Sequence, residues 1–141
     1  MNDACAASRA ELALQEVLAS WNRAAAAWDV EGLASLYTED ALMFGGLPGL
    51  SVGAPGMRAY FGSYVGALAG AHLELVDQHL LELAPEVYLA QGFGVFKFRR
   101  VDGRNTGTTM RTTWVIATHA GSWKIRQHHF STIPDKPPID G

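Results

Sequence analysis

The second half of the chain consists of stretches in which apolar and polar residues alternate, and this pattern constrains the fold more than any other feature. The alternation has the period of two that is typical of half-buried strands. Turn signals separate the stretches, including Asp102-Gly103 and Ala120-Gly121, which can supply the positive φ that a tight hairpin needs. The expected strands span 72–83, 87–101, 108–118 and 123–133. We therefore expect an antiparallel sheet whose apolar face is covered by other elements.

The first half of the chain supplies that cover as three expected helices. Ser8 and Glu11 form a capping box ahead of a helix that runs to about Trp28, and Asp29 is the expected N-cap of a second, short helix. A third helix is expected from Pro55. Its apolar face consists of Met57, Tyr60, Phe61, Tyr64 and Leu68. The stretch 45–56 before it is rich in Gly and Pro and is expected to be loop.

Helices followed by hairpin-linked strands predict an α+β fold, with a cone-shaped, curved antiparallel or mixed sheet packed on three helices from the N-terminal half. The chain has 141 residues, of which 48% are hydrophobic, so we expect a single domain over residues 1–141. Residues 1–7 and 135–141 are expected to be flexible tails. A curved sheet over helices leaves a hollow at its wide end, and such hollows are common small-molecule sites.

Composition argues against several classes of function. A net charge of −3 with scattered Lys and Arg argues against nucleic-acid binding, and we interpret the basic cluster 97–100 as the solvated end of a strand rather than a phosphate site. The chain lacks a signal-peptide pattern and any apolar run of about 18–20 residues, so we expect a cytoplasmic protein without membrane partners. Cys5 is the only cysteine, which rules out an internal disulfide or a thiolate cage.

No metal and no cofactor are expected. The adjacent His128 and His129 point to opposite faces of a strand and cannot bind one ion together. His72 and His79 also fall on opposite faces. A metal site needs about three ligands, and the expected strands do not bring that many onto one face.

The closing strand, 123–133, indicates which residues face the hollow. If Ala120-Gly121 forms a two-residue turn, Trp114 lies opposite Gln127 on the neighbouring strand. The charged side chains of the two strands share the other face, which belongs in water. We therefore expect Gln127, His129 and Ser131 to point inward.

His129 is the best candidate for a catalytic residue, as a general base, because imidazole titrates near neutral pH. Hydrogen bonding to a neighbouring group would explain this histidine equally simply. A bulge in the strand would exchange His129 for His128, and the sequence leaves both open. None of the acidic residues lies on the last three expected strands, so no carboxylate base is evident there; Glu74 and Asp77 on the earlier strand remain alternatives.

Aromatic residues build most of the expected core, and several are expected to line the hollow. The expected pocket residues are Trp21, Tyr37, Phe61, Tyr64, Phe96, Trp114, Gln127, His129 and Ser131. Such a pocket suits a small apolar or aromatic molecule, whose orientation the polar groups of Gln127, His129 and Tyr64 would fix.

Two stretches resemble known families. The closing strand, with Trp123, Gln127, His129, Ser131 and Pro134, resembles the last strand of the calcium/calmodulin-dependent protein kinase II association domain, although Gln127 replaces a histidine of that pattern. The stretch 21–44 is similar to the wider nuclear transport factor 2-like superfamily, which includes SnoaL-like cyclases and ketosteroid isomerases. The resemblance implies a cone-shaped α+β fold that forms a homodimer through its sheet.

The resemblance does not bring an active site with it. Ketosteroid isomerases use a tyrosine and an aspartate, and the matching positions here are Trp21 and Gly45. The pocket of the kinase association domains is basic, and Arg111 is the one candidate for an inward arginine here. Two functions stay open: a small-molecule-binding protein, which could be a lyase, isomerase or cyclase, and a non-catalytic oligomerisation domain similar to the kinase hub.

Overall fold

The computed structural model describes residues 8–140. The expected N-terminal tail at 1–7, which contains Cys5, and the last residue, Gly141, lie outside the described residues. The helices are α1 (Arg9–Ala25), α2 (Val30–Ala34), α3 (Gly53–Gly62) and the short 3-10 helix η2 (Pro138–Asp140). The strands are β1 (Tyr37–Phe44), β2 (Leu50–Val52), β3 (Leu68–Ala84), β4 (Val87–Arg100), β5 (Asn105–His119) and β6 (Ser122–Thr132).

The first two helices begin at the predicted caps. The Ser8 side chain accepts a hydrogen bond from the Glu11 backbone N–H, and the Glu11 carboxylate accepts one from the Ser8 backbone, which confirms the capping box. The Asp29 side chain accepts from the Gly32 N–H at 3.0 Å and caps α2, also as predicted. Between the two helices, Trp28 adopts a positive φ of 49° and ends α1.

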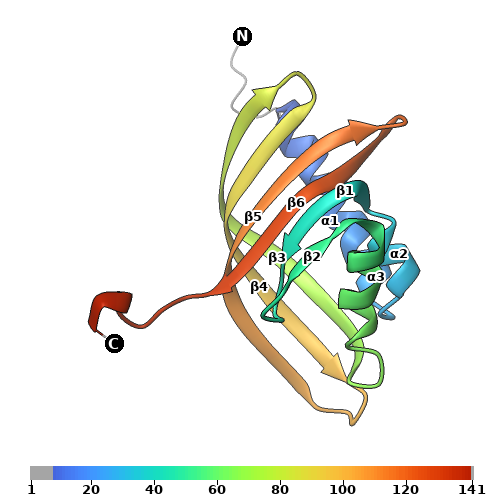
Figure 1. Cartoon of the computed structure of the whole chain (residues 1–141), viewed down its shortest axis with the longest axis vertical. Coiled ribbons are helices and arrows are strands. Elements are labelled where there is room, and N and C mark those ends of the chain that lie inside the picture. Colours follow the sequence, from blue (N-terminus) through green and yellow to red (C-terminus); the bar gives the residue numbers. More distant parts are fainter. Residues whose placement is uncertain (1–7, 141) are drawn as a thin grey trace.

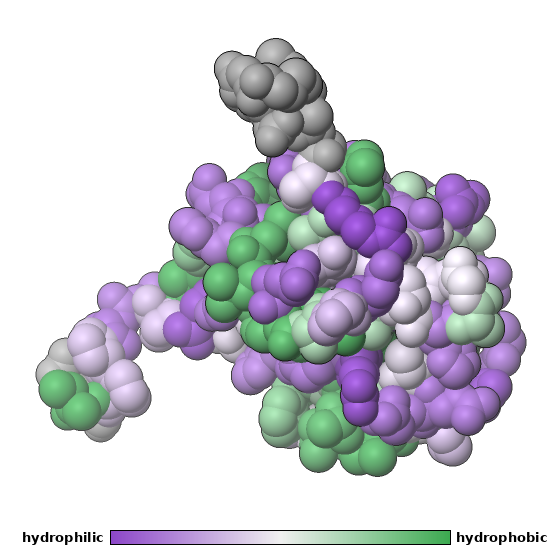
Figure 2. Space-filling view, turned by 90° about the horizontal axis from the view of Figure 1, so that it is seen from above, coloured by the Kyte–Doolittle hydropathy of each residue, from purple (hydrophilic) through white to green (hydrophobic). Residues whose placement is uncertain are grey.

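The six strands form one mixed sheet in the order β2-β1-β6-β5-β4-β3, in which β1 and β6 run parallel and the other neighbours run antiparallel. All three α-helices lie on one side of the curved sheet, and within residues 8–140 no α-helix covers the other side (Figure 1). This arrangement confirms the predicted fold class. The stretch 45–56, expected to be loop, contains β2 and the start of α3. After Thr132 the chain runs away from the body, as both views show (Figures 1 and 2).

The register of β6 departs from the expected one by a single extra residue. Ala120 has a φ of 51° and Gly121 a φ of 82°, and they close the two-residue hairpin turn between β5 and β6. The pairing then shifts at Arg126, so that Trp114 lies opposite His128 instead of Gln127. Arg126 itself is exposed and lies 3.4 Å from the Asp40 carboxylate, on a part of β1 where the register also shifts.

Because of this bulge, His128 and Phe130 face the core, and the alternative that the sequence left open is decided in favour of His128. The Tyr37 hydroxyl lies 2.8 Å from His128 Nδ1 and accepts a hydrogen bond from Trp21 Nε1 at 3.4 Å. The tautomer of the neutral imidazole sets which of Tyr37 and His128 donates in this contact, and His128 Nε2 is buried without a hydrogen-bond partner among the described residues. Burial lowers the pKa of His128 well below its ordinary value and raises that of Tyr37.

Acidification is expected to lower the free energy of unfolding through His128. The unfolded chain binds a proton at imidazole near pH 6.5, whereas the pKa of the buried ring is lower, so the native state resists protonation. The stability that depends on a neutral His128 is fully present above about pH 6.5. Below that pH the free energy of unfolding falls by at most about 1.4 kcal/mol per pH unit. Urea denaturation between pH 5 and 8 measures this slope. His128→Asn should reduce it and the exposed His129→Asn should not; an equal slope in both variants would contradict the assignment.

Candidate functional site

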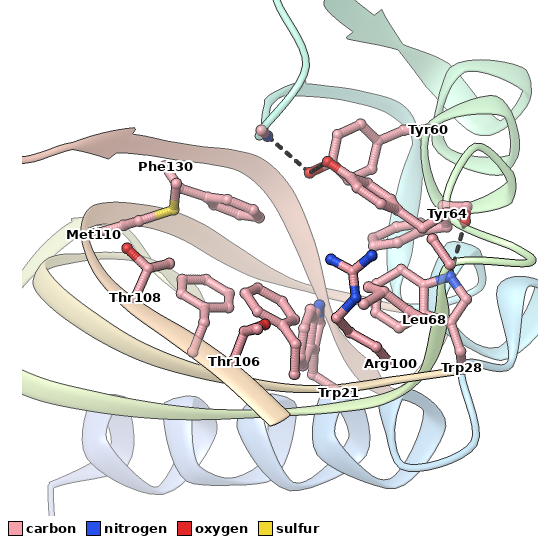
Figure 3. A pocket seen from close by; sticks show the side chains of 15 residues that line it. Trp21, Trp28, Tyr60, Tyr64, Leu68, Arg100, Thr106, Thr108, Met110 and Phe130 are labelled. Atoms are coloured by element: carbon pink, nitrogen blue, oxygen red, sulfur yellow. Dashed lines mark hydrogen bonds between the residues drawn. The ribbon is translucent and has the colours of Figure 1, made fainter. Parts of the chain in front are cut away.

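A cavity of about 360 Å³ lies between α3, the end of α1 and the inner face of the sheet. Its size falls within the range typical of small-molecule pockets. The helical layer and its connections contribute Trp21, Trp28, Tyr60, Phe61 and Tyr64, and the strands contribute Leu68, Phe96, Phe98, Arg100, Thr106, Thr108, Met110 and Phe130. Figure 3 shows these side chains converging on a common space from the helices and from the sheet.

The aromatic side chains of the cavity are held in place by edge-to-face packing and by a hydrogen bond to a backbone carbonyl. Trp28 packs against Phe61 and Tyr64 with ring centroids 5.9 Å apart in both pairs, and Trp21 packs edge-on against Phe96 at 6.3 Å. The Trp28 indole N–H donates to the Phe61 carbonyl at 2.9 Å, near the end of α3, where helix carbonyls lack partners within the helix. The walls therefore offer a ligand mainly ring faces and edges.

Tyr60 places a hydroxyl at the upper edge of the cavity. Its oxygen accepts a hydrogen bond from the Gly46 N–H at 2.8 Å and lies 3.5 Å from the Tyr64 hydroxyl (Figure 3). Burial raises the pKa of Tyr60, so the phenol stays protonated at neutral pH. The close approach to Tyr60 explains the glycine at position 45, because a Cβ there would clash with the Tyr60 ring atom Cζ.

Arg100 carries the one formal charge among the described residues that line the cavity. It follows the buried Phe96 and the half-buried Phe98 at steps of two along β4, and these three side chains share the inner face. The mouth around it is formed by the hairpin between β4 and β5, in which Thr106 and Thr108 are exposed. Residues 97–100 were expected at the solvated end of a strand, and Arg100 was not predicted to line the cavity. The alternation of inward and outward side chains along the strand from Phe96 onward is the signal that predicts an inward Arg100.

The residues expected in the pocket divide into three groups. Trp21, Phe61, Tyr64 and Phe96 line the cavity. Tyr37 and Trp114 do not line it: both are buried in the core, where Tyr37 contacts His128 and the Trp114 ring meets the His128 ring edge-on.

Gln127, His129 and Ser131 lie on the opposite face of the sheet, which corrects the orientation expected for them. The extra residue at Arg126 turns this part of β6 over, so that the expected inward row points outward. His129 packs against Phe44 with ring centroids 5.4 Å apart, and Ser131 Oγ accepts from the Arg111 guanidinium at 3.2 Å. Arg111, considered above as an inward arginine, is exposed on this outer face. His129 therefore does not reach the aromatic cavity as a general base.

The described residues lining the cavity include no carboxylate and no histidine. Between residues 8 and 140, no group of three or more His, Cys, Asp or Glu side chains is arranged to hold a metal ion. Within the same residues, none of the helices combines the length and the hydropathy needed to span a bilayer. The chemical groups that this cavity offers are thus aromatic rings, hydroxyls and one guanidinium.

Comparisons with solved structures support the fold. The chain is similar to a candidate calcium/calmodulin-dependent protein kinase II association domain from Xanthomonas campestris, with 19% identity, 87% of each chain covered and a TM-score of 0.78. It is also similar to a candidate scytalone dehydratase from Novosphingobium aromaticivorans, with 12% identity over 87% of this chain and 83% of that one, and a TM-score of 0.76. A nuclear transport factor 2-like superfamily protein from Salmonella enterica matches with 17% identity over 91% and 94% of the two chains, at a TM-score of 0.72.

No curated protein sequence matches the chain. The solved structures share less than 25% identity with it, so they establish the fold and no activity. The model of the SnoaL-like domain matches residues 14–136, which include all three α-helices from Leu14 onward and the whole sheet. The resemblance seen in the sequence is thereby confirmed, and the chain belongs to the SnoaL-like domain family, with a nuclear transport factor 2-like fold.

Proposed function

We propose that the protein binds a small, flat, largely apolar molecule in the cavity between α3 and the sheet. The observation that carries this proposal is the cavity itself: about 360 Å³ lined by the rings of both layers, with few polar groups. Aromatic faces and edges favour flat apolar or aromatic ligands, and a few polar groups suffice to orient them. The family membership and the similarity to a candidate dehydratase support a lyase, isomerase or cyclase type of chemistry.

Tyr60 is the residue best placed to act on such a ligand. Its oxygen already accepts the Gly46 N–H, so the phenolic proton can be donated to the Tyr64 hydroxyl 3.5 Å away or, in its place, to a ligand. Because burial raises the pKa of this phenol, it donates a hydrogen bond rather than abstracting a proton. We therefore propose that Tyr60 polarises a carbonyl or hydroxyl oxygen of the ligand, in a reaction that does not depend on a carboxylate base of the cavity.

Filling part of the cavity is expected to weaken ligand binding. Thr108 lines the cavity and Thr109, the next residue on β5, points to the other face; both are exposed, so both should tolerate an indole. Thr108→Trp should weaken the binding of 2-acetylnaphthalene about tenfold or more, which corresponds to about 1.4 kcal/mol. Thr109→Trp serves as the matched control. Titration calorimetry measures both; no saturable binding to the wild type, or equal binding by the two variants, would refute the proposed site.

Removing the Tyr60 hydroxyl should weaken the binding of a carbonyl ligand selectively. Tyr60→Phe is expected to lower the affinity for 2-acetylnaphthalene about 3- to 10-fold, the usual contribution of one neutral hydrogen bond, and to leave the affinity for naphthalene nearly unchanged. Tyr88→Phe is the control, because Tyr88 is buried outside the cavity. Equal losses for the two ligands would show that Tyr60 acts through the shape of the cavity and donates nothing to the carbonyl.

We also propose that the protein forms a homodimer through the outer face of the sheet. This face carries exposed apolar side chains, including Leu42 (45% exposed), Phe44 (41%) and Phe93 (36%), mixed with polar residues such as His129 and Ser131. From above, hydrophobic side chains also reach the surface in several patches between hydrophilic ones (Figure 2). Apolar side chains gathered on a sheet face without covering helices are typical of an interface. The same face would serve the alternative function, an oligomerisation domain without a ligand.

A charge placed in this face should favour the monomer. Phe44→Glu is expected to shift the mass measured by light scattering after gel filtration from that of a dimer to that of a monomer, because the interface would bury an unpaired carboxylate. Leu12→Glu on α1 replaces another exposed apolar side chain, which lies away from the sheet, and should leave the mass unchanged. A wild-type monomer would refute the dimer, and a larger ring would favour the oligomerisation domain.

A further inference from the structure

The charge of the cavity is unbalanced. Arg100 contributes a cationic guanidinium, and the described residues that line the cavity include no acidic side chain. The two tyrosines and two threonines of the lining are neutral, and their hydroxyls can donate hydrogen bonds. Among the groups that line the cavity, Arg100 therefore favours a ligand atom with negative charge, and the hydroxyls can add hydrogen bonds to it.

The acidic residue closest to Arg100 in the hairpin is already engaged by another arginine. Asp102 Oδ2 lies 3.5 Å from Arg100 Nε, a separation compatible with charge attraction but long for a hydrogen bond. The same carboxylate accepts hydrogen bonds from the Arg104 backbone N–H at 3.0 Å and from Arg104 Nε at 2.9 Å. The Nε of Arg100 is buried and has no hydrogen-bond partner among the described residues.

The position of Arg100 makes this open donor effective. Figure 3 shows the guanidinium group directed into the space enclosed by Phe130, Tyr64 and the threonines, at the end of the aromatic walls. The Arg100 side chain is 39% exposed, so water screens it in part, while the apolar walls beside it make its attraction for a ligand anion stronger than in open water. The planar guanidinium can donate two parallel hydrogen bonds to a carboxylate, which would fix the ligand with its ring inward and its acid group at the mouth.

We propose that the ligand of the cavity is an aromatic or other flat apolar carboxylic acid, bound as the carboxylate by Arg100 with its apolar body between the α3 tyrosines and the sheet. This inference rests on the proposed function, because it names the ligand class of the same cavity. In this arrangement Arg100 discriminates between charged and neutral ligands, and the aromatic side chains bind the apolar part of the ligand.

A pair of probes that differ in charge and hardly in shape tests the assignment. 2-Naphthoate and 2-naphthamide are titrated into the wild type, Arg100→Gln, Arg100→Lys and Lys97→Gln by calorimetry at pH 7.5. Lys97 lies on the same strand with its side chain exposed on the opposite face and controls for the loss of one positive charge. The wild type should prefer naphthoate by about 10-fold or more, as expected for a charged hydrogen-bonded pair.

The variants separate this inference from the proposed function on which it rests. Arg100→Gln should remove the preference for naphthoate and leave naphthamide binding almost unchanged, Arg100→Lys should keep part of the preference, and Lys97→Gln should keep all of it. If both probes bind equally to the wild type, or Arg100→Gln weakens both alike, the anionic ligand class is wrong and the cavity proposal stands. If neither probe binds, or Thr108→Trp does not weaken them, the cavity proposal fails and this inference fails with it.

Discussion

The extra residue at Arg126 determines which side chains at the end of β6 face the interior of the protein. Because side chains alternate along a strand, one inserted residue exchanges the two faces of everything beyond it. The bulge turns His128 and Phe130 inward, where they join Trp21 and Tyr37, and turns the row from Gln127 to Ser131 outward. The exposed Arg126 accommodates the insertion without burying its charge and lies next to Asp40. The cavity and the outer face of the sheet both follow from this choice of register.

The cavity stays open because its walls are fixed by contacts that do not involve a ligand. Trp28 is held by a hydrogen bond to α3, Tyr60 by the Gly46 backbone, and the rings by each other. Residues already satisfied in this way lose little on binding, and preorganised sites retain more of their contact energy as affinity. The polar groups placed to meet a ligand, the Tyr60 hydroxyl and the Arg100 guanidinium, lie toward one end of the cavity (Figure 3). A ligand would therefore be oriented along the cavity as well as enclosed by it.

Much of the fold was predictable because it depends on local chemistry. The Ser8 and Asp29 caps, the Ala120-Gly121 turn and the alternation of the strands are each specified by a few neighbouring residues. The bulge was not predictable in the same way, since it depends on packing between β6 and its two neighbours, and both His128 and His129 fit the local pattern. The aromatic residues of the cavity were found in part, as Trp21, Phe61, Tyr64 and Phe96. Arg100 was missed because a charged side chain at the end of a strand is usually exposed to solvent.

The mouth of the cavity is built from a part of the molecule that does little for stability. Residues 101–109 of the β4–β5 hairpin are exposed, whereas the deeper walls, such as Trp21 and Phe61, belong to the hydrophobic core. Substitutions in an exposed hairpin usually change stability little, while those in the core are costly. Relatives with the same interior could therefore acquire different ligand preferences by changing only this hairpin, and divergence of chemistry within the family need not be accompanied by divergence of the fold.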